Sequence, residues 1–289
     1  MHIQLHQFLN LLLLLLLGQT MGFVYLSWTQ ILGLFFFTFV VEVLFFTIKK
    51  ERYYFTFSSF STAIGLALMM VMTDYMLYFV VLFLALAQKH WLTYRGQHFF
   101  NPSNFALIAG MLIFYKQSHI VVGQLSQEIY LAYVVVIMAL IILYRIKRLL
   151  IPTVFIGGYL FFQYSMLVLY DPMFLSEDLF RRFSSVSFIV FIFFMLTDPK
   201  TTPEHYVLQV LFALFLAFFS TLLDYYYGYR VQHLFMVLFI LSPLFVCFNM
   251  LTQEKDNRSF ILFFVMLLVL VLSAIIYLEL QPPYYFAMD

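Results

Sequence analysis

The sequence predicts an all-α polytopic membrane protein that forms a single domain over residues 1–289. Of its residues, 64% are hydrophobic and only 10% are charged, whereas soluble proteins have about 25% charged residues. Apolar runs repeatedly reach the roughly 20 residues that a transmembrane helix needs. Trp and Tyr residues stand at several ends of these runs, as in the aromatic belts of membrane proteins. A net charge of +1 gives no reason to expect a nucleic-acid partner.

Apolar segments bounded by charged or turn residues predict ten or eleven transmembrane helices, or nine with additional half-helices. The first segment, with its leucine run, could be a signal peptide, but no Lys or Arg precedes it, so we expect a retained span. The predicted segments are 8–27, 29–48, 53–73, 75–93, 104–123, 129–146, 150–170, 183–197, 205–223, 229–250 and 259–280.

The distribution of basic residues predicts a cytoplasmic N-terminus. With the N-terminus inside, the inner loops hold 11 Lys and Arg residues and the outer loops 4, as the positive-inside rule requires. The loops at 95–104 and 198–204 then face the same side and could meet. A half-length helix between them would separate them, and Asn104–Tyr115, which is short before Lys116, is the segment most typical of one.

The first polar motif is RGQHFFNPSN at 95–104. Pro102 suits the first turn of a helix, and Asn101 before it is placed to cap that helix. The cap would leave free N–H groups and a positive dipole end that face the loop and can hold an anion. The motif is therefore either an ordinary helix start or a ligand site that includes His98, Ser103 and Asn104.

The second polar motif is TDPKTTP at 197–203. Asp198 before Pro199 ends the preceding span, because the residue before a proline avoids the helical conformation. Thr201 or Thr202 could cap the next helix, with Pro203 in its first turn and Glu204 as a favourable early negative charge. Lys200 could neutralise Asp198 or face lipid headgroups. A cytoplasmic turn and a binding site both remain open for this motif.

Outside these motifs, Glu42 is the main candidate for an ion or proton path, because a carboxylate inside a predicted span is a functional candidate. It could instead extend toward Lys49 at the interface. The lone Cys247 excludes a disulfide framework and cysteine-based metal or iron–sulfur sites, and no histidine pair predicts a haem. We expect no metal site.

Together, residues 89–104 (KHWLTYRGQHFFNPSN) and 195–203 (MLTDPKTTP) resemble paired signatures of the NqrB/RnfD family, the large membrane subunits of the sodium-pumping NADH:quinone reductase and of the Rnf electron-transport complex. The likeness is greatest to short subunit-D-like or enediyne-biosynthesis-type relatives. It covers about 53–251, and neither the two N-terminal spans in 1–52 nor the span at 259–280 adds to it.

The resemblance implies two inverted helical repeats, as in urea transporters, and flavin-dependent transmembrane electron transfer coupled to cation movement. It implies other membrane or redox subunits as partners, with the lipid bilayer of a bacterial inner membrane around them. The family's covalent flavin is attached at a Thr in a Ser/Thr-Gly-Ala-Thr motif, which this chain lacks. We therefore expect a non-covalent flavin, FMN or riboflavin. The cofactor-binding residues that the resemblance implies are His98, Asn101, Pro102, Ser103, Asn104, Thr197, Asp198, Pro199, Lys200, Thr201 and Thr202.

Three functions remain open from the sequence. The first is a membrane subunit of a redox-driven translocase, which could not oxidise NADH alone because it has no dinucleotide-binding fingerprint. The second is a channel or carrier for a small solute or ion, in which Glu42 and the polar run Ser58, Ser59, Ser61 and Thr62 would line a path. The third is an accessory or assembly subunit without its own chemistry.

Overall fold

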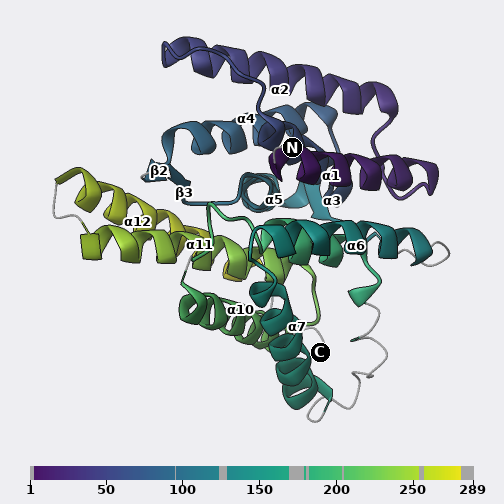
Figure 1. Ribbon diagram of the computed structural model, residues 1–289, viewed down its shortest axis with the longest axis vertical. Coiled ribbons are helices and arrows are strands. Elements are labelled where there is room, and N and C mark those ends of the chain that lie inside the picture. The colour runs from purple at the N-terminus through teal and green to yellow at the C-terminus, as the bar shows by residue number, and fades with distance from the viewer. Residues whose placement is uncertain are drawn as a thin grey trace.

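In the computed structural model the chain forms a bundle of helices with two small two-stranded sheets (Figure 1). The structure describes residues 3–94, 96–123, 129–168, 179, 182–203, 205–253 and 257–280. Helices α2 and α4 pack together at one end of the bundle, and α7 and α10 pack together at the other, with α5 and α11 between them. The predicted all-α class is confirmed for these residues.

The N-terminal half contains five helices and all four strands among the described residues. A strand follows each of the two shortest of these helices, and these two strands pair antiparallel, Met70 opposite Ile120. The helices are α1 (Ile3–Thr20), α2 (Trp28–Ile48), α3 (Phe57–Met69), α4 (Tyr75–Trp91) and α5 (Pro102–Ile113); the strands are β1 (Met70–Met72), β2 (Thr93–Tyr94), β3 (Gln97–His98) and β4 (Ser118–Ile120); the 3-10 turn η1 is Tyr115–Gln117.

The regular elements of the C-terminal half are all helices among its described residues. Two of its helices continue directly into π-helical turns, η2 (Tyr164–Val168) and η3 (Phe191–Met195). The helices are α6 (Ile129–Arg145), α7 (Leu150–Gln163), α9 (Val186–Val190), α10 (Tyr206–Tyr227), α11 (Gln232–Gln253) and α12 (Asn257–Leu280).

Three helical segments among the described residues are long and apolar enough to cross a membrane: Trp28–Ile48, Tyr206–Tyr227 and Ile261–Leu280. Large apolar side chains are exposed along them, such as Phe36 at 70% and Ile261 at 62%. A soluble monomer rarely exposes such surface over whole helices, whereas lipid contact accounts for it. The other apolar helices are shorter, so the structure supports a membrane location without giving ten or eleven full spans.

Helices α3 and α5 are half-length. They contain 13 and 12 residues, or about 20 and 18 Å, against roughly 30 Å of bilayer hydrocarbon. The predicted half-length helix at Asn104–Tyr115 corresponds to α5. The predicted span at 53–73 is too long, because the chain after Met69 becomes extended to pair with β4. The pairing of β1 and β4 satisfies backbone groups that these short helices leave inside the molecule.

Candidate functional site

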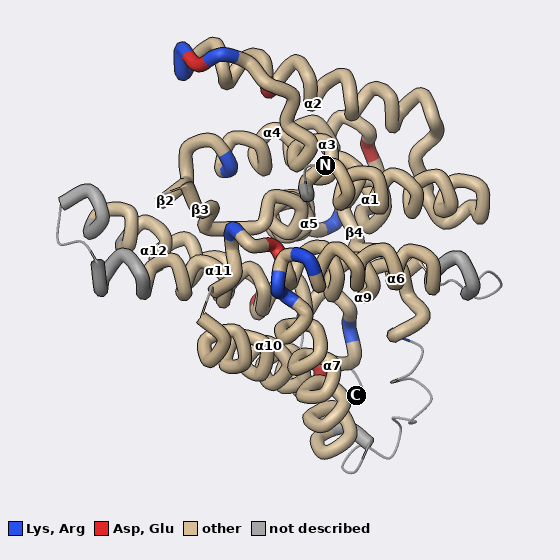
Figure 2. Tube along the Cα trace, viewed as in Figure 1, with Lys and Arg blue, Asp and Glu red and all other residues tan. Residues whose placement is uncertain are grey.

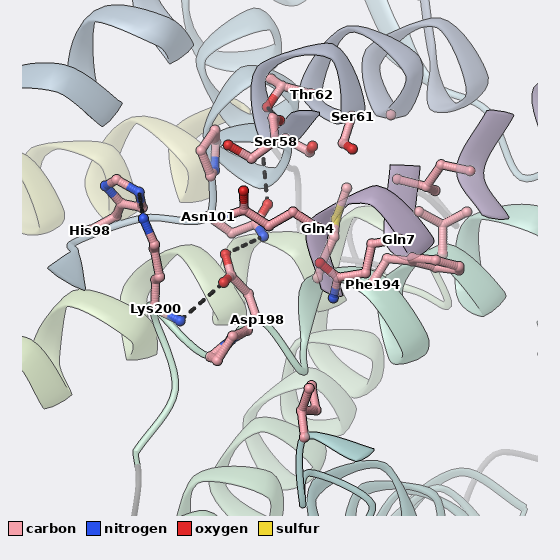
Figure 3. Close-up of a pocket in the computed structure, with 18 residues that line it drawn as sticks. Gln4, Gln7, Ser58, Ser61, Thr62, His98, Asn101, Phe194, Asp198 and Lys200 are labelled. Carbon is pink, nitrogen blue, oxygen red and sulfur yellow. Dashed lines mark hydrogen bonds between the residues drawn. The ribbon is translucent and has the colours of Figure 1, made fainter. Parts of the chain in front are cut away.

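The two polar motifs meet in space. The Asn101 Nδ2 amide donates a hydrogen bond of 2.9 Å to Asp198 Oδ2, although the two residues are 97 positions apart. The Lys200 ammonium lies 3.5 Å from His98 Nε2. Figure 3 shows these four side chains gathered on one side of a cavity. The prediction that the loops at 95–104 and 198–204 could meet is confirmed, although Arg95 lies outside the described residues.

Asn101 is held by the start of α5. Its Oδ1 accepts hydrogen bonds of 3.1 Å from the backbone N–H groups of both Ser103 and Asn104, and Pro102 occupies the first helical position. The predicted helix cap is confirmed. The prediction that the cap leaves these N–H groups free for an anion is wrong, because the Asn101 side chain already satisfies them. Since its oxygen faces the helix, the Asn101 nitrogen must face Asp198.

Asp198 organises the second motif as a tight turn. Its Oδ1 accepts a 3.0 Å bond from the Lys200 backbone N–H, and its carbonyl accepts a 2.7 Å bond from the Thr202 hydroxyl. The predicted end of the preceding span is confirmed. The predicted cap of the next helix is wrong, because α10 begins at Tyr206 and His205 caps it by accepting from the Val207 N–H. Glu204 lies outside the described residues.

Four of the predicted site residues face away from the cavity and hold the fold. The Asn104 amide donates a 3.1 Å bond to the Phe235 carbonyl and so connects α5 to α11. The Thr197 hydroxyl bonds the Phe193 carbonyl one turn earlier, while Thr201 and Thr202 bond the Asp198 carbonyl. The seven that line the cavity are His98, Asn101, Pro102, Ser103, Asp198, Pro199 and Lys200.

The cavity has a volume of about 510 Å³, within the roughly 300–1,000 Å³ of sites for small organic ligands. Its wall is polar on one side, where α3 contributes Ser58, Ser61 and Thr62 and α1 contributes Gln4 and Gln7. The sequence analysis missed both glutamines, which lie before the leucine run of α1 with no motif around them.

The remaining wall is apolar and comes mainly from the second half of the chain. Val190, Phe194 and Met195 of α9 and η3 lie there with Ile146 and Leu11. An apolar wall opposite a few fixed polar groups is the usual construction of a site for a flat organic molecule. The close approach of α3 to α5 shapes the boundary, because a Cβ at Gly65 would lie 3.0 Å from Ser103 Oγ.

Two titratable groups in the cavity wall have shifted pKa values. Burial, together with the positive charges of Lys200 and Lys89, lowers the pKa of His98 to about 3, so the imidazole is neutral at pH 7. Burial raises the pKa of the Asp198 carboxyl above its ordinary value, while hydrogen bonds from the Lys200 N–H and the Asn101 amide oppose the rise. The wall therefore offers a neutral imidazole, an ammonium and a carboxyl group.

Glu42 belongs to a second polar group beside the cavity. It is completely buried in α2 and accepts a 2.6 Å hydrogen bond from the Ser59 hydroxyl. His90 Nε2 lies 3.2 Å from both of its carboxylate oxygens, and the Lys89 ammonium lies 3.6 Å from Oε1 and also donates to Ser59. The alternative that Glu42 extends toward Lys49 is wrong, because its partners lie on α3 and α4.

A third group, the Asp224 cluster (Tyr159, Gln163, Arg182, Asp224 and His233), was missed from the sequence. Asp224 Oδ2 accepts 2.8 Å bonds from Arg182 and Gln163, and Oδ1 accepts a 2.7 Å bond from His233 Nδ1. Arg182 also donates to the Tyr159 hydroxyl. Its members come from four separate segments of the chain, and Asp224 falls just beyond the predicted span 205–223, where hydrophobicity gives no reason to expect a buried charge.

Comparisons with known proteins add no relative. No model of a known protein family matches the chain, and no curated protein matches it. The described residues contain no group of three or more His, Cys, Asp or Glu side chains that could hold a metal ion. The resemblance to NqrB and RnfD therefore stays a prediction that rests on the two motifs.

Proposed function

We propose that this chain is a membrane subunit of a flavin-dependent electron-transport system, similar to NqrB and RnfD, and that it holds a non-covalent flavin in the cavity between its two motifs. The observation that carries the proposal is the contact between Asn101 and Asp198 at the wall of a cavity of about 510 Å³. This contact brings two motifs that lie 97 residues apart in the sequence to the wall of one cavity.

The wall residues suit a flat heterocycle that carries carbonyl and N–H groups. Lys200 and the hydroxyl of Ser58 can donate hydrogen bonds, while Asp198 can accept one. Phe194 and Met195 can pack against the faces of a ring. A bound flavin would supply electron transfer, and the protein would orient it and exclude water.

Beside the cavity, the chain's own residues can also shift a proton within the protein. Lys89 donates to Ser59, and Ser59 donates to Glu42. If Lys89 gives its proton to Ser59 Oγ while Ser59 gives its own to Glu42, one N–H and one O–H bond break and two O–H bonds form. The ion pair becomes a neutral pair, and no charge crosses the apolar interior unpaired.

The first experiment is an absorbance and fluorescence scan of the detergent-purified protein before and after acid precipitation. We expect a flavin spectrum that moves to the supernatant with acid, because no covalent attachment motif is present. A colourless protein that also takes up neither FMN nor riboflavin would contradict the proposal.

The coupling is tested with Ser59→Ala, which breaks the chain of hydroxyl and ammonium groups. Reduction of the bound flavin by dithionite, followed by the loss of flavin absorbance, should slow in this variant. Ser118→Ala is the matched control, since Ser118 is also a buried serine but bonds the Gly110 carbonyl away from the cavity. Equal rates in both variants would remove Ser59 from the path.

A solute channel is the second candidate, because α3 and α5 are half-length and α3 presents Ser58, Ser61 and Thr62 to the cavity. Half-length helices that end inside the molecule are typical of transporter sites. Flux of urea into liposomes that contain the protein would support this function, and it should fall in Ser61→Leu. If Asn104→Ala and Asp198→Ala reduced expression alone, an accessory role would be favoured instead.

A further inference from the structure

Helix α1 contributes side-chain amides to the cavity wall. Gln4 and Gln7 line the cavity together with Leu11 of the same helix. Residues three and four positions apart lie on one face of a helix, so this face of α1 is turned toward the cavity. Figure 3 shows the two glutamines well away from His98 and Lys200, and the charged residues of the protein lie elsewhere along the chain (Figure 2). The cavity wall therefore has a charged part and a neutral polar part.

The side-chain amides of α1 differ in their contacts. The helix has four of them: Gln4, Gln7, Asn10 and Gln19. The Asn10 amide donates a 3.3 Å hydrogen bond to the Val135 carbonyl, and the Gln19 amide donates to the Leu26 carbonyl. Neither of these two residues lines the cavity. Gln4 and Gln7, which do line it, have no side-chain hydrogen-bond partner among the described residues. The amides that face the cavity are thus the ones that the protein leaves free to bind a ligand.

Helix α3 adds a hydroxyl group of the same kind. The hydroxyls of Ser61 and Thr62 donate to backbone carbonyls within α3, and the Ser59 hydroxyl donates to Glu42. The Ser58 hydroxyl lines the cavity and has no partner among the described residues. Because α1 packs against α3, this hydroxyl and the two free amides come from adjoining helices and can contact one ligand.

The chemistry of these three groups selects a neutral ligand. An amide side chain has a carbonyl that accepts and an N–H₂ that donates, and a hydroxyl can do both. A phosphate or a carboxylate only accepts hydrogen bonds, so it would leave the carbonyl oxygens of Gln4 and Gln7 without donors, and an ammonium group would leave their N–H₂ groups without acceptors. Each unpaired group in an enclosed site costs binding free energy. A ligand group with both a carbonyl and an N–H satisfies all three side chains.

We infer that Gln4, Gln7 and Ser58 form a recognition site for a neutral group in which an N–H stands beside a carbonyl, as in an amide, an imide or a urea. The inference extends the ligand site to α1, which lies outside the stretch that resembles the NqrB/RnfD family. Two ligands carry this chemistry: the imide edge of a flavin ring, and urea itself. The inference rests on the proposed function in taking a flavin as the first probe.

The test compares riboflavin with riboflavin methylated at its imide nitrogen. Wild type should bind riboflavin about tenfold more tightly, the factor that corresponds to one hydrogen bond, as measured by flavin fluorescence quenching. The double variant Gln4→Met with Gln7→Met should lose this preference, because methionine has a similar length and helix propensity but neither donates nor accepts strongly. Gln19→Met is the control on the same helix and should keep it. Each single variant should lose part of the preference, so the test remains decisive if the double variant does not fold.

The outcomes distinguish this inference from the flavin proposal. Equal binding of the two flavins to wild type overturns the inference while the flavin site stands, and so does a preference that the double variant retains or that Gln19→Met also loses. If neither flavin binds to wild type, the flavin proposal fails and urea becomes the probe. Urea uptake into liposomes that falls severalfold in the double variant and not in Gln19→Met supports the inference and identifies its source. No uptake, or equal uptake by all three proteins, overturns it.

Discussion

The cavity wall and the Asp224 cluster are both built around a carboxylate that receives partners from distant parts of the chain. They differ in what surrounds that carboxylate. The Asp198 carboxylate accepts hydrogen bonds from the Asn101 amide and from the Lys200 backbone N–H. The Lys200 ammonium lies near His98. The Asp224 carboxylate accepts hydrogen bonds from the side chains of Arg182, Gln163 and His233 and from the Arg230 backbone N–H.

The difference indicates where chemistry can occur. Asp224 is enclosed and satisfied by a guanidinium group that does not release its proton, so this cluster joins α7, α10 and α11 and is suited to holding them together. Asp198 borders the cavity, beside a lysine and a neutral histidine that can form hydrogen bonds with a ligand. We interpret the first as a structural connection and the second as a binding site.

The largest expected effect is at the Asp224 cluster. Asp224→Ala leaves the Arg182 charge buried without its partner, and loss of one member of a buried ion pair costs about 3–5 kcal/mol. We expect little folded protein in fluorescence-detected size-exclusion chromatography. Asp74→Ala is the control, because Asp74 is an exposed helix cap that bonds only the Met76 N–H, and its loss should cost about 1 kcal/mol. Similar profiles for the two variants would refute the structural role.

The second prediction exchanges the two groups that join the motifs. Asp198→Asn alone turns a second amide N–H₂ toward the fixed Asn101 amide and leaves a buried donor unpaired, which costs about 1–3 kcal/mol. The double variant Asn101→Asp with Asp198→Asn restores every bond, because a carboxylate at 101 can cap α5 and accept from the new amide at 198.

Thermal unfolding of the wild type, both single variants and the double variant gives the coupling directly. The double variant should recover most of the lost stability, while the negative charge has moved to the α5 side of the cavity. If stability returns and flavin binding does not, Asp198 acts on the ligand as well as on the fold. Additive losses would show that the two motifs do not depend on each other.

The third prediction concerns pH. The folded pKa of His98 is about 3, below its ordinary value of 6.5, so in the window between them the unfolded chain binds the proton first. Stability should therefore fall as the pH drops through this window, by about 2 kcal/mol at pH 5 for this group. His98→Gln should flatten the dependence of the unfolding temperature on pH, and His119→Gln, at an exposed position in β4, should leave it unchanged.

The cavity wall was partly predictable from the sequence because its residues are local and carry backbone signals. Asn101 before Pro102 and Asp198 before Pro199 mark a helix start and a chain turn by rules that act within a few residues. The same rules could not tell which side chains face the cavity, so Asn104 and Thr197 were placed in the site although they bond to backbone carbonyls elsewhere.

The Asp224 cluster was not predictable by these means. Arg182 and Asp224 are 42 residues apart, and neither stands in a motif. A charged residue at the end of an apolar run is usually a loop residue, and only the packing of α7 against α10 reverses that interpretation for Asp224. The fold class could be predicted from composition. The helix lengths could not, because β1 and β4 form and pair within two segments that hydrophobicity alone assigns to membrane spans.

The last prediction, with the smallest expected change in stability, compares how much room each of the two regions has for a larger side chain. Ser61→Val places extra carbon in the cavity and should change stability by less than about 1 kcal/mol, while flavin binding weakens. Ser220→Val makes the same change one turn before Asp224, where the side chain is completely buried, and overpacking there should cost about 1–3 kcal/mol. Unfolding temperatures and flavin titrations of both variants test this. A larger loss of stability at Ser61 than at Ser220 would mean that the cavity is closed by side-chain movement, and the binding site would have to be placed elsewhere.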